Sequence, residues 1–289
     1  MLKESTLING RHIFMEFGMD FNFFKRTLGL KKTAEYIAQA GFTQLDYTPN
    51  FRNDNWKDEM HEAMSIFADL GLKVHQTHAP FNRNHQYDGF DHYHLCLQRC
   101  AEATALMGAD FMVVHGDEFD FTKQEFSTEA ILDYNHKLFL PYVESAKDNG
   151  YKVAFETVFC RANRWHLPDP PTVDELLDLI ASFNSDSAVC CWDFGHCFVE
   201  FEHEAPNWIR KFGSLIQCTH VHDNIGNDSH QMPMTGDIDW KETITAMKDI
   251  GYNGVMSIEY AHGCLPDFML KDFIKMSYTA VEYVWNHSK

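Results

Sequence analysis

Histidine, aspartate and glutamate recur at the ends of consecutive short runs of apolar and β-branched residues. In chain order these end residues are His78, His115, Glu156, Asp193, His220 and Glu259. The last four of these residues, two Glu, one Asp and one His, form an oxygen-rich ligand set with one nitrogen, which suits Mn²⁺, Mg²⁺, Co²⁺ or Zn²⁺. Four ionisable groups would be costly to bury together without a cation. The residue types therefore predict a divalent metal site.

A second pattern is the spacing of His220 and His222. Residues two apart on a strand point to the same face, so both imidazoles can face one site. We expect one of them to bind the metal and the other to contact the substrate or a metal ligand.

The elements that would position these side chains alternate along the whole chain, strand then helix. The predicted strands are Ile13–Met19, Thr43–Tyr47, Lys73–His78, Phe111–His115, Lys152–Thr157, Ala188–Phe194, Gln217–His222 and Val255–Tyr260. The predicted helices are Lys31–Ala40, Trp56–Leu70, Tyr93–Met107, Glu129–Asp148, Val173–Phe183, Trp208–Phe212, Trp240–Asp249 and Asp272–Trp285.

Glycine separates several predicted helices from the next strand, as in Leu70-Gly71-Leu72 and Asn149-Gly150-Tyr151. Glycine there supplies the left-handed backbone that ends a helix. Eight strand–helix pairs with short returns favour parallel strands and right-handed crossovers. A doubly wound open sheet is the main alternative, but the sequence has no Gly-rich phosphate loop. We therefore expect an α/β fold, a single (β/α)8 TIM barrel that spans residues 1–289 as one domain.

The formal net charge of −18, from 24 Lys and Arg against 42 Asp and Glu, would repel a polyphosphate backbone. We therefore expect no nucleic-acid partner. Cys190 and Cys191 are neighbours that a strand would point to opposite faces, so a disulfide framework is not expected. No apolar run reaches membrane-spanning length and no signal pattern opens the chain, which favours a cytoplasmic protein without a membrane partner.

Four strings carry a resemblance to a known family: Asp193-Phe194-Gly195-His196, His220-Val221-His222-Asp223-Asn224, Gly236-Asp237-Ile238-Asp239-Trp240 and Ser257-Ile258-Glu259. They resemble the xylose-isomerase-like superfamily, and more narrowly its sugar phosphate isomerase/epimerase branch, which shares its fold with endonuclease IV. The resemblance covers essentially the whole chain. It implies that one divalent metal ion (Mn, Mg, Co or Zn) is bound by Glu156, Asp193, His220 and Glu259.

The resemblance also implies isomerisation or epimerisation of a small sugar-like substrate, with Glu156 and Glu259 as the acid/base pair. One carboxylate would remove a proton next to a carbonyl, and the other would return it on the opposite face. The metal would stabilise the enediolate that forms between these steps. His196 would contact a substrate oxygen. Further candidate substrate contacts are His78, His115, His222 and His230, although a histidine with a purely structural role remains an alternative at each.

The nuclease branch of the superfamily uses three zinc ions and nine ligands. Candidates for all nine are present: His78, His115, Glu156, Asp193, His196, His220, Asp228, His230 and Glu259. Asp228-Ser229-His230 reproduces the Asp-x-His pair of the third zinc site. The short segment between His220 and Asp228, the negative charge and the lack of an aromatic and basic wedge disfavour a DNA nuclease. A site with two or three metals that acts on a small substrate remains open.

The sequence departs from the ketose 3-epimerases after the fifth predicted strand. Glu156 is followed by Thr157-Val158-Phe159-Cys160-Arg161-Ala162-Asn163-Arg164-Trp165, without the acidic partner of those enzymes. The Arg that they place after the seventh strand is missing, and His230 is nearby instead. Arg161 and Arg164 are therefore candidates to bind a phosphate or carboxylate of the substrate, although solvated loop charges are the simpler interpretation.

Two other function classes stay open. A lyase similar to inosose dehydratase would use the same ligands and eliminate water after the same enolisation. A non-catalytic sugar-binding barrel would bind its ligand without turnover. By analogy with the family, the chain is a candidate for a homodimer or homotetramer.

Overall fold

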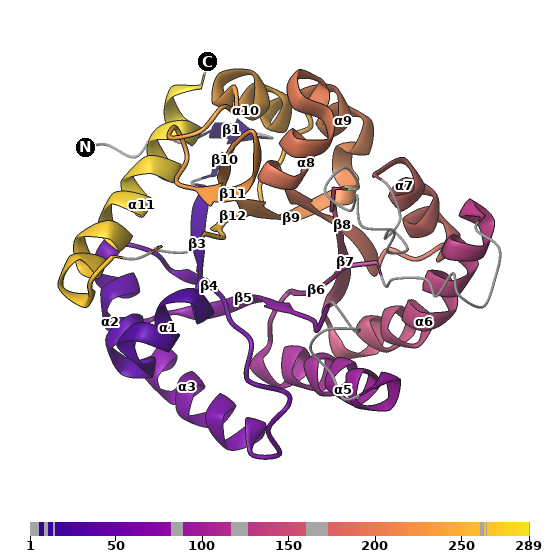
Figure 1. Ribbon diagram of the computed structural model, residues 1–289, viewed down its shortest axis with the longest axis horizontal. Coiled ribbons are helices and arrows are strands. Elements are labelled where there is room, and N and C mark those ends of the chain that lie inside the picture. Colours follow the sequence, from indigo (N-terminus) through magenta and orange to yellow (C-terminus); the bar gives the residue numbers. More distant parts are fainter. Residues whose placement is uncertain are drawn as a thin grey trace. The chain divides into compact units, whose positions relative to one another are not determined.

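We analysed a computed structural model that describes residues 6–8, 11–13, 15–81, 89–116, 127–159, 173–260, 263 and 265–288. Eight parallel strands form a closed barrel in the order β12-β3-β4-β5-β6-β7-β8-β9 (Figure 1). Helices connect the strands, so the predicted TIM barrel is confirmed. The barrel strands are β3 (Glu16–Asp20), β4 (Gln44–Asp46), β5 (Lys73–His78), β6 (Phe111–Val114), β7 (Lys152–Glu156), β8 (Ala188–Asp193), β9 (Ile216–Val221) and β12 (Val255–Ile258).

The described helices lie between these strands in the chain, except α11, which follows the last strand. They are α1 (Asn22–Leu28), α2 (Leu30–Ala40), α3 (Trp56–Leu70), α5 (Phe90–Met107), α6 (Thr128–Asn149), α7 (Val173–Ser182), α8 (Phe194–Phe201), α9 (Ala205–Phe212), α10 (Trp240–Asp249) and α11 (Asp267–His287), with short 3-10 turns η1 (Glu202–Glu204) and η2 (Gly213–Leu215). None of the described helices combines the length and the apolar character that crossing a membrane requires.

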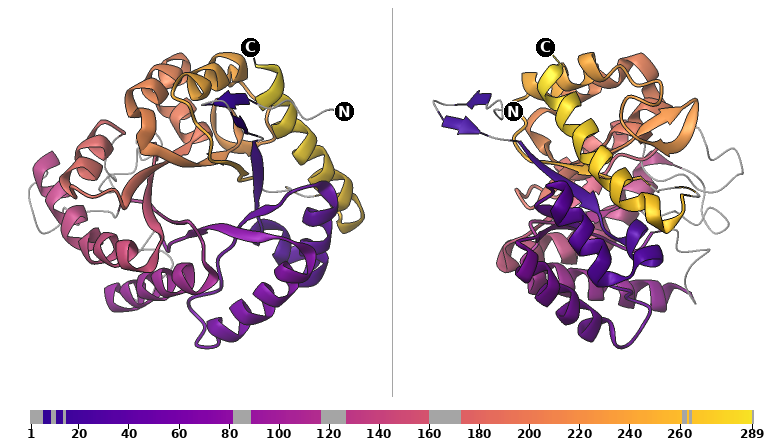
Figure 2. Two further views of the ribbon diagram at one scale, coloured as in Figure 1. Left: turned by 180° about the vertical axis from the view of Figure 1, so that it is seen from behind. Right: turned by 90° about the vertical axis from the view of Figure 1, so that its left-hand side faces the viewer.

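The chain divides into two compact units. Unit 1 comprises Met1–Asp46, Ser65–Lys73 and Trp192–Lys289, and unit 2 comprises Tyr47–Met64 and Val74–Cys191. In unit 1, α11 packs against α2 and α10 and also contacts β3 and β12 (Figures 1 and 2). The parallel register places Ser257 beside His220 and Asp20 beside Asp46. The carboxyl ends of four strands of unit 1 thus bring polar side chains to one level.

Unit 2 has an aromatic core beneath its helices. Phe155 of β7 meets Phe139 of α6 edge to face and stacks on Phe183, just after α7. β7 also pairs in parallel with β6 and β8, with Glu156 opposite Cys191. Successive residues of a strand point to opposite faces, so the Glu156 side chain points away from the face on which Phe155 packs. Glu156 is thus the polar group at the end of β7.

The structure corrects several predicted boundaries. The sixth strand ends at Asp193, not Phe194, because the Asp193 carboxylate caps the next helix by accepting a hydrogen bond from His196 N at 2.6 Å. That helix, α8, is missing from the prediction because its apolar residues continue the apolar run of the strand. The first barrel strand begins at Glu16, and Ile13 belongs to a separate hairpin of β1 (Thr6–Ile8) and β2 (Arg11–Ile13).

Two further elements differ from the prediction. The last helix begins at Asp267 rather than Asp272. A hairpin of β10 (Asp223–Ile225) and β11 (Asn227–Gln231) follows β9 where no strands are predicted. Its residues are polar and largely exposed or half-buried, so they lack the apolar alternation by which a strand is recognised.

Candidate functional site

Unit 1 holds a buried cluster of acidic and imidazole groups at the ends of β8, β9 and β12. His220 Nδ1 lies 3.3 Å from Glu259 Oε2 and 3.9 Å from Asp193 Oδ2. The Asp193 and His220 side chains are fully buried and that of Glu259 is 14% exposed. Glu259 is placed by the sheet, because its backbone N–H donates to Val221 O at 3.1 Å. Three of the four predicted metal ligands are therefore neighbours in unit 1.

The opposite edge of the His220 ring faces a carboxylate that was not among the predicted site residues. His220 Nε2 is 3.2 Å from Asp46 Oδ2, at the end of β4. A carboxylate accepts hydrogen bonds, so Nε2 carries a proton, and Nδ1, which faces Glu259 and Asp193, carries a lone pair unless the ring is protonated. A lone pair and two carboxylates directed at one another repel unless a positive charge lies between them. Glu259 Oε2 is also buried without a hydrogen-bond partner among the described residues. These donors fit a divalent cation.

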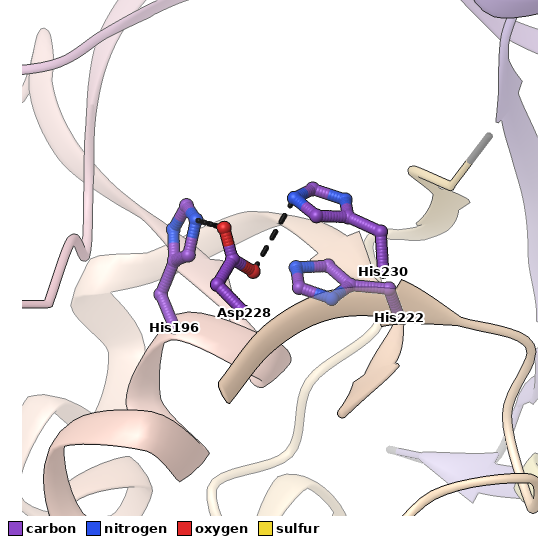
Figure 3. A group of neighbouring side chains, drawn as sticks. All are labelled: His196, His222, Asp228 and His230. Carbon is purple, nitrogen blue, oxygen red and sulfur yellow. Dashed lines mark ion pairs between the residues drawn. The ribbon is translucent and has the colours of Figure 1, made fainter. Parts of the chain in front are cut away.

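A second cluster in unit 1 consists of His196 of α8, His222 between β9 and β10, and Asp228 and His230 of β11 (Figure 3). Each side chain offers a ligand atom, and these atoms all lie within 4.8 Å of one another. The rings of His222 and His230 are stacked at 3.9 Å, and Asp228 lies between His196 and His230. This cluster has the composition of a metal site of its own.

The two clusters share Asp193. His222 Nε2 lies 3.0 Å from Asp193 Oδ1, and His196 Nδ1 lies 3.5 Å from Asp193 Oδ2. The predicted shared face of His220 and His222 is confirmed, since both imidazoles approach this one carboxylate.

Asp228 and His230 form an ion pair, with His230 Nε2 3.3 Å from Asp228 Oδ1. Burial opposes protonation of His230, but the bond to Asp228 and the charges of Glu259 and Asp193 outweigh it and raise its pKa to about 9. Burial likewise opposes ionisation of Asp228, yet the bond to His230 holds the Asp228 pKa below its ordinary value. His230 Nδ1 donates to Glu259 O at 2.9 Å, and Nε2 faces the Asp228 carboxylate. Nε2 therefore either carries a second proton, which makes the ring an imidazolium, or lies beside a cation.

The segment after β9 positions this second cluster through side-chain bonds to the backbone. Asn224 Nδ2 donates to Gly195 O at 2.8 Å, and Asn224 Oδ1 accepts from Ser229 N at 2.8 Å and His230 N at 3.1 Å. His230 has a φ of 44°, a left-handed conformation that costs a non-glycine residue about 1–2 kcal/mol. Asn224 thus ties the backbone next to His196 to the strained backbone of His230.

Asp223 anchors the same segment. Its Oδ1 accepts from Asn224 N at 2.9 Å and Ile238 N at 3.1 Å. Its Oδ2 accepts from Met234 N at 3.0 Å and Trp240 Nε1 at 2.8 Å. All four acceptor directions are used, so Asp223 is structural. Trp240 itself is buried, and Asp239 caps α10, because its Oδ1 accepts from Glu242 N at 3.1 Å.

Unit 2 contains a third cluster. His78 Nε2, at the end of β5, and His115 Nε2, just after β6, lie 3.1 and 3.0 Å from the same oxygen of Glu156, Oε2. His78 Nδ1 donates to Ala79 O at 2.9 Å, so its Nε2 carries a lone pair unless the ring is protonated. This lone pair and the Glu156 carboxylate repel each other unless a proton or a metal ion lies between them. The predicted residues His78, His115 and Glu156 therefore also form a plausible ligand set.

Most of the predicted site residues therefore belong to one of three clusters. Arg161 and Arg164 lie outside the described residues. Asp46 and Asp20 were not among the predicted site residues, although both end a strand of the barrel. The signal was available in the rule that identified the other six, namely an acidic or imidazole group at a strand end.

A comparison with protein families shows to which family the chain belongs. The model of the xylose isomerase-like TIM barrel family matches residues 34–276. The chain belongs to this family. The resemblance expected from the four strings is thereby confirmed, and its site motifs fall within the matched segment.

Among the family's relatives, the uncharacterized protein MJ1311 of Methanocaldococcus jannaschii is 27% identical over 195 residues. That match covers 65% of this chain and 61% of MJ1311, so it spans less than two thirds of the relative. Similar solved structures include a D-tagatose 3-epimerase-like protein (TM-score 0.72, 22% identity, 93% of this chain and 98% of that one). Another is a D-psicose 3-epimerase studied with D-fructose (TM-score 0.74, 14% identity, 94% and 99%). These similarities establish the shared fold.

Proposed function

We propose that this protein is a divalent-metal-dependent isomerase or epimerase of a small sugar or sugar-like substrate. The observation that carries the proposal is the arrangement of His220, whose Nδ1 is directed at Glu259 and Asp193 in a buried cluster. Similarity to structures of sugar 3-epimerases supports the substrate class.

In the proposed site, Glu156 of β7 joins Asp193, His220 and Glu259 as the fourth ligand. The bound metal would supply the positive charge that stabilises an enediolate. Glu156 and Glu259 would remove and return the proton on opposite faces of the substrate. His196 would donate to a substrate oxygen from its position at the start of α8. Because the Asp193 carboxylate and the His196 backbone are linked, the ligand and the substrate contact would be held in one geometry.

The proposal is tested by incubating the protein with Mn²⁺ and a panel of ketoses and inososes in D₂O and following the products by NMR. Deuterium at the carbon next to the carbonyl, with retention of all hydroxyls, is the expected result for an epimerase or isomerase. Deuterium accompanied by loss of water identifies the lyase instead. If neither the ketoses nor the inososes incorporate deuterium, enolisation chemistry is contradicted.

The roles of the carboxylates are tested with Glu156→Gln and Glu259→Gln. Each should lower turnover at least 100-fold, since general acid–base catalysis contributes about 10²–10⁴-fold. Glu129→Gln, at an exposed position of α6, is the matched control and should keep wild-type turnover. Ligand binding that survives both replacements, in a protein whose wild type has no turnover, would identify a sugar-binding barrel.

A second candidate function is a phosphoester hydrolase with more than one metal that acts on a small substrate. It is favoured by one observation, the second cluster in unit 1, whose four ligand atoms lie within 4.8 Å of one another without any contribution from Glu259 or His220. The net charge of −18 argues against a nucleic-acid substrate for such a site.

Elemental mass spectrometry on protein purified without chelator separates the two candidates. About one ion per chain, lost in His220→Ala and retained in Asp228→Ala, supports the isomerase site with its four ligands. Two or three ions, one of them lost in Asp228→Ala or His230→Ala, support the hydrolase. Phosphomonoester and phosphodiester cleavage then becomes the deciding assay.

A further inference from the structure

We propose that Asp46 is a positioning residue that orients His220 and fixes its tautomer for metal binding. The inference rests on the proposed function, because it assigns the Asp46 carboxylate a role toward the same metal. Asp46 acts through His220 and does not itself touch the ion.

The geometry is that of a carboxylate behind a metal-binding imidazole. Asp46 Oδ2 lies 3.2 Å from His220 Nε2, on the far edge of the ring from Glu259 and Asp193. Histidines that bind metals through one nitrogen commonly donate the other N–H to such an acceptor. The donation places the proton on Nε2, keeps the lone pair on Nδ1 and makes Nδ1 more basic.

Asp46 is itself held in place by the sheet. It is the last residue of β4, its backbone carbonyl accepts from Phe21 N at 2.9 Å, and it pairs with Asp20 of β3 in the parallel register. The Asp46 side chain is 2% exposed and that of His220 is fully buried. A buried carboxylate with so little freedom is placed to select one ring orientation, and little solvent is available to substitute for it.

Asp46 is distinct from the ligands. Among the described residues, it belongs to none of the groups whose donor atoms gather within 4.8 Å, whereas His220 and Glu259 do. The Nε2 atom that Asp46 contacts is the one that points away from that gathering. Its contribution is therefore orientation and charge behind the ligand.

The test measures Mn²⁺ affinity directly, by the loss of the electron paramagnetic resonance signal of free Mn²⁺ during titration. Asp46→Ala should weaken Mn²⁺ binding about 10–100-fold, the usual effect of removing a carboxylate behind a metal-binding histidine. Asp46→Asn keeps an oxygen that can accept from Nε2 but loses the charge, so its affinity should lie between those of the Ala variant and the wild type. Co²⁺ absorption spectra give a second readout, since a rotated ring changes the ligand field.

The matched control is a second Asp–His pair, Asp110 and His75, in which Asp110 Oδ2 lies 2.9 Å from His75 Nδ1. Asp110→Ala should leave Mn²⁺ affinity and the Co²⁺ spectrum unchanged. Circular dichroism confirms folding of each variant, and Asp46→Asn alone decides the question if Asp46→Ala does not fold.

Two outcomes overturn the proposal in distinguishable ways. Wild-type affinity in folded Asp46→Ala or in Asp46→Asn, with binding lost in His220→Ala, overturns the role of Asp46 and leaves the metal site standing. Wild-type affinity in His220→Ala itself overturns the proposed metal site, and the inference about Asp46 falls with it.

Discussion

Gly195 lies directly against the imidazole ring of His222. A Cβ at position 195 would be 1.9 Å from His222 Cε1 and 2.3 Å from Nδ1, well inside van der Waals contact. The glycine in the string Asp193-Phe194-Gly195-His196 therefore makes room for the ring that contacts Asp193. A sequence motif that carries the family resemblance thus has a steric explanation in this chain.

Gly195→Ala should force the His222 ring away from Asp193. Overpacking of this kind costs about 1–3 kcal/mol, so the free energy of unfolding in urea should fall by that amount. Replacing His222 by Ala removes the clash, and Gly195→Ala should cost much less in the His222→Ala background. Additive effects of the two substitutions would contradict the contact.

Asp223→Ala should destabilise the protein more than most single substitutions. Four donors lose their acceptor, and each buried donor left unpaired costs about 1–3 kcal/mol, although solvent entering the gap will reduce the sum. We expect a loss of at least ~3 kcal/mol by urea denaturation. Trp240 fluorescence gives a local readout, because its Nε1–H loses its partner. An unchanged midpoint would show that Asp223 does not anchor the segment.

Asn224→Ala should disturb the second cluster selectively. Its side chain holds Gly195 and His230 through separate bonds, so its loss frees the backbone on both sides of the cluster. If a second ion binds at His196, Asp228 and His230, its affinity should fall about tenfold while the His220 site keeps its ion. Elemental analysis of dialysed protein measures this. Equal loss from both sites would point to a general structural effect.

The raised pKa of Asp20 predicts that the stability of chelator-treated protein depends on pH. Burial, followed by the charges of Asp46 and Glu259, raises the pKa of Asp20 from 3.8 to about 8, against the opposing effect of backbone bonds from Phe23 and Asn22. The folded state therefore keeps a proton that the unfolded state releases between about pH 4 and 8. The stability contributed by this proton is present at low pH and is lost as the pH rises toward 8.

Asp20→Asn is the test of this assignment. Relative to wild type, the variant should gain stability as the pH rises from 5 to 8, by at most about 1.4 kcal/mol per pH unit. Urea denaturation with EDTA at several pH values measures the difference. A constant difference across this range would show that Asp20 is ionised throughout.

The barrel and most of the site were accessible from the sequence because both depend on local rules. Strands with polar ends and helices that end in glycine repeat with a regular period, and a strand end in a parallel barrel faces the site. Glu156, Asp193, His220 and Glu259 were identified in this way. Asp46 also ends a strand, so its position followed the same rule, but its contact with His220 joins residues far apart in the chain and has no signal in the sequence.

The β10–β11 hairpin and helix α8 were not predicted, for a different reason. Residues of β10 and β11 are held by side-chain bonds from Asp223 and Asn224, which no hydrophobic pattern reveals. α8 begins because Asp193 caps it, and that capping competes with the tendency of the apolar run to extend the strand. In both cases the hydrogen bonds of one or two polar side chains decide the local structure against the hydrophobic pattern.

The β10–β11 hairpin also has a consequence for how such proteins diverge. Asp228, His230 and the Asn224 that fixes them come from one short contiguous stretch outside the eight barrel strands. A single insertion or deletion there can add or remove half of a binding cluster while every barrel strand keeps its partners. The composition of the second cluster can therefore be altered through this one short stretch, with the barrel itself left as it is.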